Sequence, residues 1–401
     1  MKILVIDLGS KLNSFGGQAR IAEILYRKLA RYFGAYYLGY ETGYIKSGRG
    51  AIILDRGIVG LEARKLKISE SWIVRFLYNL LIVNRLRDVD RYALFEKVSK
   101  INPDVIITSS IQDINLLKFF RKKGLEFKSV YIDHGSVSTT IDRYLSKEGI
   151  PLTIGTGVDS LSLEEKKRKF FGFFDMNVAL NNEQFEKMYE YTEKVILIPN
   201  GMDVNVRKNM GEERAFKSKY NISNGDFVVL YVGRMFDRQK NVSTLIKAFK
   251  NIRDGKMKLL LVGDGPSLKD YKELAGGDDR IIFTGSMGDR KIGNAYRSSD
   301  LFVLPSFWEG FSLTIIEAAS HSLPLILSEP AYIEDLRSED IGNIASFYPS
   351  DWKRLKSIIE LFRKDPESRK RAINASMKIK KKFTESSMIE NYRMMLERLV
   401  E

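Results

Sequence analysis

The segment PSFWEGFSLTIIEAA, residues 305–319, has the plainest structural pattern in this chain. It follows the apolar run at 300–304, which is typical of a buried strand, and continues after Ser312 into an apolar-periodic segment typical of a helix. A strand, a glycine-containing loop and a helix in this order favour an α/β fold. We therefore expect Glu309 in the loop and Glu317 in the second helical turn, at the carboxyl edge of a parallel sheet, where ligands collect in such folds.

Both glutamates allow two interpretations. A glutamate is usually a solvated surface residue, and that interpretation applies to Glu309 and Glu317 alike. Glu317, however, lies among apolar neighbours, and a carboxylate in such surroundings needs polar partners. The hydroxyl groups of a bound ribose or sugar are suitable partners, which favours a binding site.

Composition limits the class of protein. A chain of 401 residues, 44% hydrophobic and 29% charged, is long enough for two globular domains. Cysteine is absent, which excludes disulfides, thiolate metal sites and a cysteine nucleophile and fits a reducing compartment. The net charge of +14 predicts an anionic partner, either a nucleotide diphosphate, anionic lipid or nucleic acid. Since no nucleic-acid-binding motif is recognisable, we expect no nucleic-acid partner.

The first half of the chain alternates apolar runs with helical patterns. Strands are expected from Lys2 and at 36–40, 51–54, 104–108, 128–133, 175–180 and 194–198, which indicates a parallel sheet. Gly17 precedes a periodic segment at 19–29, so a free helix N-terminus could face a phosphate there. His134 directly follows one strand. The basic amphipathic stretch at 65–87 either packs on its own sheet or lies in a membrane interface, and no segment is long enough to span a bilayer.

The second half repeats this organisation. The strand at 227–232 is followed by Gly233 and Arg234, and Lys240 stands just before a helix expected to reach Phe249. Two cations and a helix dipole near one point favour a diphosphate clamp. The strand at 258–262 leads into GDGP, residues 263–266, with Pro266 expected at the first helical position. A strand at 281–285 follows, and the tail from 351 to 401 is helical in period.

These motifs together resemble a known family. Glu309 and Glu317, in a PSxxEGFxxxxxEA frame, resemble the E-x7-E signature of the retaining GT-B glycosyltransferases of family 4, the glycosyl transferases of group 1. IPNGMD at 198–203 resembles the family's signature between its two domains. The resemblance implies two Rossmann-like, doubly wound parallel-sheet domains with a deep interdomain cleft. Residues 1–203 would form the acceptor-side domain, 204–382 the nucleotide-sugar-binding domain, and 383–401 a helix that crosses back to the first domain.

The resemblance also implies an activity. It is the transfer of a sugar, with retained configuration, from a UDP- or GDP-sugar to a hydroxyl of a glycan or lipid-linked acceptor. No metal and no cofactor are expected, and no covalent nucleophile is assigned. Arg234 and Lys240, with Gly17, would neutralise the leaving diphosphate, and Arg238 could share this role because the gap from Arg234 to Lys240 is one residue longer than the commonest form.

The remaining roles concern the sugar, the ribose and the base. Glu309 and His134 would contact the donor sugar, and Glu317 the ribose. Further donor-binding positions are expected at Gly263, Thr284, Gly285, Gly310, Phe311, Ser312 and Leu313.

Two features depart from the family pattern, and two alternatives stay open. Ser322 replaces a usual glycine, and residues 329–331 replace a glycine-rich turn. His321 is most simply a helix-terminal residue. The alternatives are a GT-B sugar-nucleotide epimerase and a non-catalytic basic protein that binds membrane or nucleic acid on the same fold. Because the chain begins with a strand and shows no signal sequence, we expect a cytoplasmic protein, with a peripheral contact to the inner face of an anionic membrane as a hypothesis.

Overall fold

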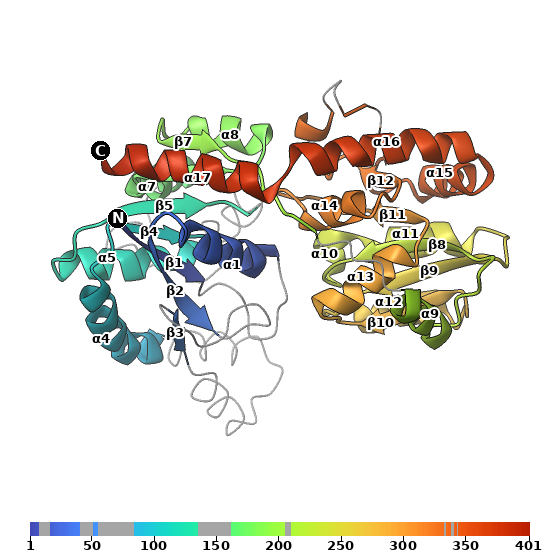
Figure 1. Cartoon of the computed structure of the whole chain (residues 1–401), viewed down its shortest axis with the longest axis horizontal. Helices are drawn as coiled ribbons and strands as arrows, with labels where there is room; N and C mark the ends of the chain where they lie inside the picture. Colours follow the sequence, from blue (N-terminus) through green and yellow to red (C-terminus); the bar gives the residue numbers. More distant parts are fainter. Residues whose placement is uncertain are drawn as a thin grey trace. The chain divides into compact units, whose positions relative to one another are not determined.

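The computed structural model describes residues 1–7, 17–40, 51–54, 84–134, 162–204, 210–332, 334–337, 341–342 and 344–401. This part of the chain divides into two compact units, each built on one sheet (Figure 1). Unit 1 contains Met1–Leu180, Gln184–Ile198 and Ile389–Glu401, and unit 2 contains Asn181–Glu183 and Pro199–Met388.

Unit 1 has a parallel sheet with the strand order β3-β2-β1-β4-β5-β6-β7. Its strands are β1 (Lys2–Asp7), β2 (Gly34–Tyr40), β3 (Ala51–Leu54), β4 (Val105–Thr108), β5 (Lys128–Ile132), β6 (Met176–Ala179) and β7 (Val195–Leu197). The helices before unit 2 are α1 (Gly17–Leu29), α4 (Asn84–Ile101), η2 (Ile111–Asp113), α5 (Ile114–Lys122), α7 (Leu163–Phe173) and α8 (Asn182–Tyr189).

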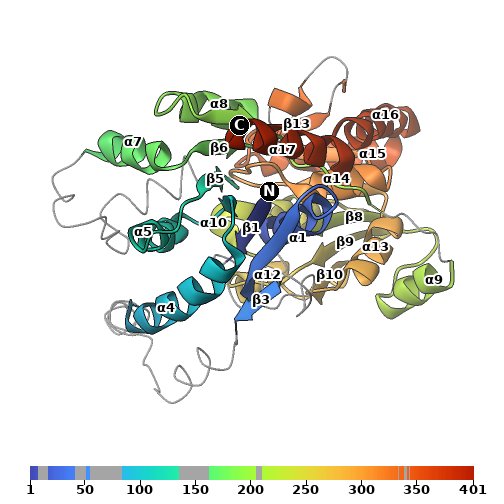
Figure 2. The same cartoon turned by 60° about the vertical axis from the view of Figure 1, so that its left-hand side comes forward.

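Apolar periodicity explains how unit 1 is assembled. Helix α1 buries one face, which includes Ile21 and Leu25, and packs on β1 and β2 (Figure 2). Strands β1, β4 and β5 are almost entirely buried, as expected for parallel strands covered on both faces. On the other side of the core, Tyr131 packs edge-on against Phe170 and stacks on Phe174, which ties α7 to β5.

Unit 2 has a second parallel sheet, with the order β10-β9-β8-β11-β12-β13. Its strands are β8 (Phe227–Val232), β9 (Met257–Val262), β10 (Ile281–Gly285), β11 (Leu301–Leu304), β12 (Leu325–Ser328) and β13 (Ala345–Phe347). Its helices are α9 (Met210–Lys219), α10 (Asp237–Lys240), α11 (Val242–Lys250), α12 (Leu268–Ala275), α13 (Asp289–Arg297), α14 (Leu313–Ser320), η3 (Glu334–Leu336), α15 (Trp352–Lys364) and α16 (Pro366–Lys382).

The last helix belongs to both units. Helix α17 (Glu385–Val400) starts in unit 2, and its part from Ile389 onward packs within unit 1. Tyr392 and Leu396 on this helix are fully buried.

Each sheet has one point where the strand order reverses. In unit 2, β8 lies between β9 and β11, so consecutive connections run away from the β8–β11 boundary in opposite directions. In a doubly wound sheet the loops after the two boundary strands separate and leave room for a ligand at their carboxyl ends. In unit 2 these are the loops after Val232 and after Leu304, and they carry Arg234 and Glu309 respectively.

The structure confirms the expected doubly wound α/β fold and most of the expected strands, with ends that shift by one or two residues. Three details differ. Helix α1 begins at Gly17 itself, α10 was not expected, and α12 begins at Leu268, so Pro266 precedes the helix instead of occupying its first position. The basic stretch at 65–87 lies outside the described residues up to 83. Of the helices in the described ranges, none is long and apolar enough to cross a bilayer.

Candidate functional site

The loop after β8 carries an exposed arginine. Gly233 continues the ladder by donating its N–H to Val262 O at 3.0 Å. The Tyr231 hydroxyl donates to the carbonyl oxygen of Arg234 at 2.9 Å, and burial together with the charge of Glu309 raises the pKa of this tyrosine, so it stays a neutral donor. The Arg234 guanidinium is exposed and lies 5.4 Å from the ring centre of Phe236.

The next helix, α10, is held at both ends. Asp237 accepts hydrogen bonds from the hydroxyl of Tyr271 at 2.9 Å and from the backbone and side chain of Ser243 at 3.1 and 3.0 Å. Its carboxylate therefore covers the N-terminus of α11. Asn241, which is 2% exposed and left-handed (φ 49°), ends α10 and starts α11. Its amide donates to the carbonyls of Pro305 at 3.0 Å and Pro349 at 2.8 Å, which ties the β8 loop to the β11 loop.

Lys240 and Glu309 form an ion pair across these two loops. The Lys240 Nζ lies 2.6 Å from Glu309 Oε1, and their side chains are only 15% and 7% exposed. The hydroxyl of Ser306 donates to the same oxygen at 2.5 Å, and Ser306 is held in turn by Ser328, whose hydroxyl donates to the Ser306 carbonyl at 2.5 Å. Among the described residues, none is hydrogen-bonded to Glu309 Oε2. One carboxylate oxygen of Glu309 is thus fixed by two partners.

Glycines bring the loops after β8, β9 and β10 close together. Gly263 has a φ of +140°, and a Cβ there would overlap the carbonyl oxygen of Gly233. The Gly263 N–H donates to Gly285 O at 3.0 Å, and Gly285 also has a positive φ. The Thr284 hydroxyl donates a hydrogen bond to the carbonyl oxygen of Gly285 at 2.9 Å. These predicted donor-binding residues therefore form a compact backbone surface beside Gly233.

Two buried asparagines hold the loop before α14. Asn181 donates to the carbonyl of Gly310 at 2.6 Å, and Asn200 donates to the carbonyl of Phe311 at 3.1 Å. Both asparagines are 2% exposed. Ser312 precedes the helix without capping it, because its hydroxyl pairs with Thr314 at 2.9 Å, and Leu313 begins the helix. The first backbone N–H groups of α14 therefore lack a side-chain cap.

Glu317 is half-buried on α14 and has a polar partner. Its Oε2 accepts a hydrogen bond from the Tyr296 hydroxyl at 2.7 Å. The Tyr296 ring stacks on His321 with centroids 5.0 Å apart, and His321 Nδ1 lies 2.8 Å from the Glu317 carbonyl. His321 directly follows α14, as expected of a helix-terminal residue, and burial lowers its pKa.

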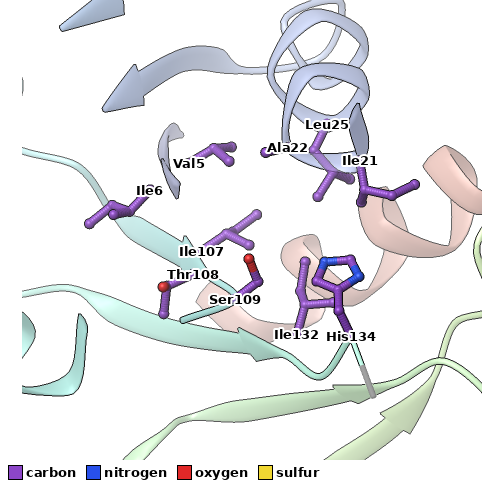
Figure 3. A pocket seen from close by; sticks show the side chains of 10 residues that line it. All are labelled: Val5, Ile6, Ile21, Ala22, Leu25, Ile107, Thr108, Ser109, Ile132 and His134. Atoms are coloured by element: carbon purple, nitrogen blue, oxygen red, sulfur yellow. The ribbon is translucent and has the colours of Figure 1, made fainter. Parts of the chain in front are cut away.

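In unit 1 the predicted residues lie at the carboxyl edge of the first sheet. His134 stands just after β5 and lines a small cavity together with Ser109 and residues of β1, α1 and β4 (Figure 3). Desolvation lowers the pKa of His134 to about 4, so its imidazole is neutral at pH 7. Gly17 is exposed at the first position of α1.

Sequence reasoning missed several residues of the unit 2 site. Asn200 belongs to the IPNG turn, which was interpreted only as a turn former, and Asn241 was considered only as a helix start. Ser306 was quoted but given no role, and Asn181 and Tyr296 were not considered. Asn181 and Tyr296 act over long separations in sequence, which no local pattern reports. Among the described residues there is no group of three or more His, Cys, Asp or Glu side chains arranged to hold a metal ion.

The core of unit 2 matches a known protein family. Residues 212–379, which include β8 to β13, match the family described as glycosyl transferases group 1. Ser322, where the family usually has glycine, adopts φ 58°, the left-handed conformation that glycine reaches most easily. Glu329, in the other departing segment, accepts hydrogen bonds from Ser346 at 2.5 Å and Arg337 at 2.6 Å, which hold its pKa below the usual range.

Two curated members of glycosyltransferase families are similar to this chain. One is the UDP-Gal:alpha-D-GlcNAc-diphosphoundecaprenol alpha-1,3-galactosyltransferase of Escherichia coli, 30% identical over 54% of this chain and 60% of that protein. The other is the alpha-monoglucosyldiacylglycerol synthase of Streptococcus pneumoniae, 30% identical over 36% of this chain and 34% of that protein. The alignments thus span about three fifths and one third of the lengths of these relatives.

Structural similarity extends over the whole chain. The crystal structure of Anabaena HepE in complex with UDP and glucose matches 99% of this chain and 99% of its own, with a TM-score of 0.71 and 18% sequence identity. At this identity the comparison concerns the fold, which is the GT-B fold of two Rossmann-like domains.

Proposed function

We propose that this chain is a retaining glycosyltransferase that moves a sugar from a UDP- or GDP-sugar to a hydroxyl of a glycan or lipid-linked acceptor. The observation that carries the proposal is the state of Glu309. A carboxylate that is 7% exposed is held at one oxygen by Lys240 and Ser306, at the strand-order reversal of the second sheet. Such an arrangement suits recognition of sugar hydroxyls.

The positive groups near Glu309 suit the other half of the donor. Arg234 is exposed at the end of β8, and the uncapped N-terminus of α14 begins four residues after Glu309. Cations and backbone N–H groups stabilise the charge that develops on a leaving diphosphate, and stabilisation of this kind often contributes more to the rate than any other effect. No metal or cofactor is part of this proposal.

The remaining predicted residues receive roles in the same reaction. Glu317 binds the ribose hydroxyls, in exchange for or in addition to Tyr296. The backbone of Gly263, Thr284 and Gly285 lies against the nucleotide, and that of Gly310 to Leu313 against the diphosphate and the sugar. In unit 1, the neutral imidazole of His134 contacts the donor sugar, and Gly17 faces the diphosphate.

Donor and acceptor classes are supported by the relatives. The E. coli protein is named for a UDP-Gal donor and a diphosphoundecaprenol-linked acceptor, and the S. pneumoniae protein for a diacylglycerol product. A lipid-linked acceptor would suit the net charge of +14, because anionic headgroups attract a basic protein. We propose a cytoplasmic protein with a peripheral contact to the inner face of the membrane.

The deciding experiment is thermal unfolding of the purified chain with UDP, GDP, ADP and their sugars. A ligand that binds only the folded state raises the Tm by mass action. We expect one diphosphate to raise the Tm and one of its sugars to raise it further. Both shifts should vanish in Arg234→Ala, and only the sugar-dependent part should vanish in Glu309→Ala.

Transfer assays then separate the alternatives. Arg234→Ala and Glu309→Ala should fold and lose transfer activity by roughly 100-fold or more, the loss seen when one group that stabilises developing charge is removed. Full turnover by either variant contradicts the assignment. Conversion of the donor sugar without any acceptor would indicate the epimerase, and binding to anionic liposomes without any nucleotide response would indicate the non-catalytic protein.

A further inference from the structure

Helix α16 has a strong excess of positive charge. Its 17 residues contain seven lysines or arginines and one acidic residue, Glu367. The excess of six charges on this one helix compares with a net charge of +14 for the whole chain. A concentration of one sign on one element attracts an anionic partner.

The charge lies on the side of α16 that faces away from the core of unit 2. The helix buries residues such as Ala372 and Ile379 and packs on α14. Figures 1 and 2 show it at the periphery of unit 2. At 3.6 residues per turn, the exposed positions Lys370, Met377 and Lys381 fall opposite the buried face. The outer face of the helix is therefore open to solvent along its length.

Four lysines of this face are exposed and have no local counter-charge. Within the described part of the chain, no ion pair or side-chain hydrogen bond is formed by Lys370, Lys378, Lys380 or Lys381. The other three cations of α16 each donate to a carbonyl or hydroxyl oxygen nearby. The four lysines thus carry the uncompensated charge.

The neighbouring surface helices balance their charges. In α15, Lys356 pairs with Glu360 at 3.3 Å, and in α17, Arg393 pairs with Glu390 and Glu397 at 2.6 Å each. Pairs at spacings of three or four residues stabilise a helix surface, whereas like charges at these spacings repel one another. Among the described residues, α16 forms no such pair, so an external anion would relieve the repulsion between its lysines.

The residues between the lysines favour a lipid surface over nucleic acid. Met377 is 46% exposed in the middle of the basic face, and the half-buried Ile373 lies one turn before it. Apolar residues flanked by lysines on one helix face suit the interface of an anionic membrane. Single-stranded nucleic acid is usually bound by aromatic side chains on which the bases stack, and α16 contains no aromatic residue.

We propose that the outer face of α16, formed by Lys370, Lys378, Lys380 and Lys381 around Met377, binds the anionic headgroups of a lipid membrane. The lysines supply the electrostatic attraction, and Met377 enters the headgroup region. The inference rests on the proposed function, because it names the surface of the peripheral membrane contact proposed there. It assigns this contact to unit 2, whereas the sequence pattern indicated the stretch at 65–87.

Sedimentation with vesicles at low salt tests the role of the lysines. Vesicles of neutral phosphatidylcholine that also contain anionic phosphatidylglycerol should bind the wild type, and vesicles of phosphatidylcholine alone should not. The triple variant Lys370→Gln/Lys378→Gln/Lys381→Gln should bind the anionic vesicles roughly 100-fold more weakly, because each lysine near an anionic surface contributes about fivefold.

The matched control removes the same charge elsewhere. Lys97→Gln/Lys100→Gln/Lys122→Gln replaces three exposed lysines of α4 and α5 in unit 1. If α16 is the membrane-binding surface, this variant should bind the anionic vesicles within about threefold of the wild type, since exposed charges more than a Debye length from the surface are largely screened.

A fluorescent reporter tests whether Met377 enters the headgroup region. Because the chain contains no cysteine, Met377→Cys provides a single thiol for an environment-sensitive dye. Its emission should shift to the blue when anionic vesicles are added, as the dye leaves water for the interface. The control is Met210→Cys, at a residue of unit 2 that is 58% exposed, and its emission should not shift.

The inference is overturned if the wild type does not bind anionic vesicles, if the two triple variants lose binding equally, or if the dye at position 377 does not respond. Binding of an oligonucleotide in place of vesicles would assign the face to nucleic acid and also overturn it. The Tm shift with UDP or GDP separates these results from the proposed function. A diphosphate response without vesicle binding leaves the transferase proposal intact, and vesicle binding through α16 without a diphosphate response contradicts the proposed donor.

Discussion

Single residues decide how closely the loops of the unit 2 site approach. Gly263 is an example, since its φ of +140° and its contact with the Gly233 carbonyl leave no room for a side chain. The backbone between β9 and α12 can therefore lie directly against the loop that carries Arg234, and the N–H of Met235 reaches Asp264 O at 2.9 Å. A larger residue would separate these two backbones.

We predict that Gly263→Ala destabilises the chain by about 2 kcal/mol or more, because strain at a positive φ adds to an overlap with backbone that cannot move freely. Gly255→Ala is the control, since its Cβ would meet no atom within 4 Å, and its effect should stay within about 1 kcal/mol. Urea unfolding measures both. Equal stabilities of the two variants would mean that the two loops can separate without cost.

At the scale of elements, the site depends on how α10 and α11 are joined. Asn241 is the only residue between them, and its buried amide contacts the carbonyls that follow β11 and β13. Its Oδ1 accepts from the Thr244 hydroxyl at 2.9 Å. One side chain thus holds three connections, and the Lys240–Glu309 pair lies directly beside it.

We predict that Asn241→Asp destabilises the chain by about 3 kcal/mol or more, because a buried carboxylate would replace a donor that faces two carbonyl oxygens. The control is Asn251→Asp, an exposed asparagine at the end of α11 whose amide donates to Lys247 O at 2.9 Å, with an expected loss below about 1 kcal/mol. Urea unfolding of the wild type and of the two variants measures both losses of stability. Equal losses of stability in the two variants would show that the burial of Asn241 adds no cost beyond that at the exposed Asn251.

At the scale of the whole molecule, the C-terminal end of the chain returns to unit 1 after unit 2. The residues from Ile389 to Glu401 follow unit 2 in sequence but complete the core of unit 1, where Leu396 is fully buried. The last helix is therefore part of the stability of the first unit. A change near the C-terminus should therefore affect the stability of unit 1, although the other residues of this unit end at Ile198.

We predict that Leu396→Ala destabilises unit 1 by about 2–5 kcal/mol, the usual cost of a cavity left by a buried leucine. Met394→Ala, on the same helix and 40% exposed, should change stability by less than about 1 kcal/mol. Calorimetry of the intact chain measures the shift of each transition. An unchanged Tm in Leu396→Ala would contradict the packing of this helix in unit 1.

The sequence by itself determined the fold class and the position of the main site residues along the chain. Local patterns suffice for this, because strands and helices are encoded by periodicity and glycine turns by backbone conformation. The strand at 301–304, the loop with Glu309 and the helix with Glu317 are where the pattern predicted them. The predicted roles of these residues toward a donor stay predictions.

Only the tertiary structure decided which side chains meet. Lys240 and Glu309 are separated by 69 positions, Asn200 and Phe311 by 111, and Tyr296 and Glu317 by 21. No local pattern encodes such pairs. The Lys240–Glu309 pair, for example, forms because β8 and β11 are neighbours in the sheet and their loops leave its edge together. The role of Lys240 toward a diphosphate stays a prediction from the sequence, and only the folded chain shows that this lysine pairs with a buried carboxylate.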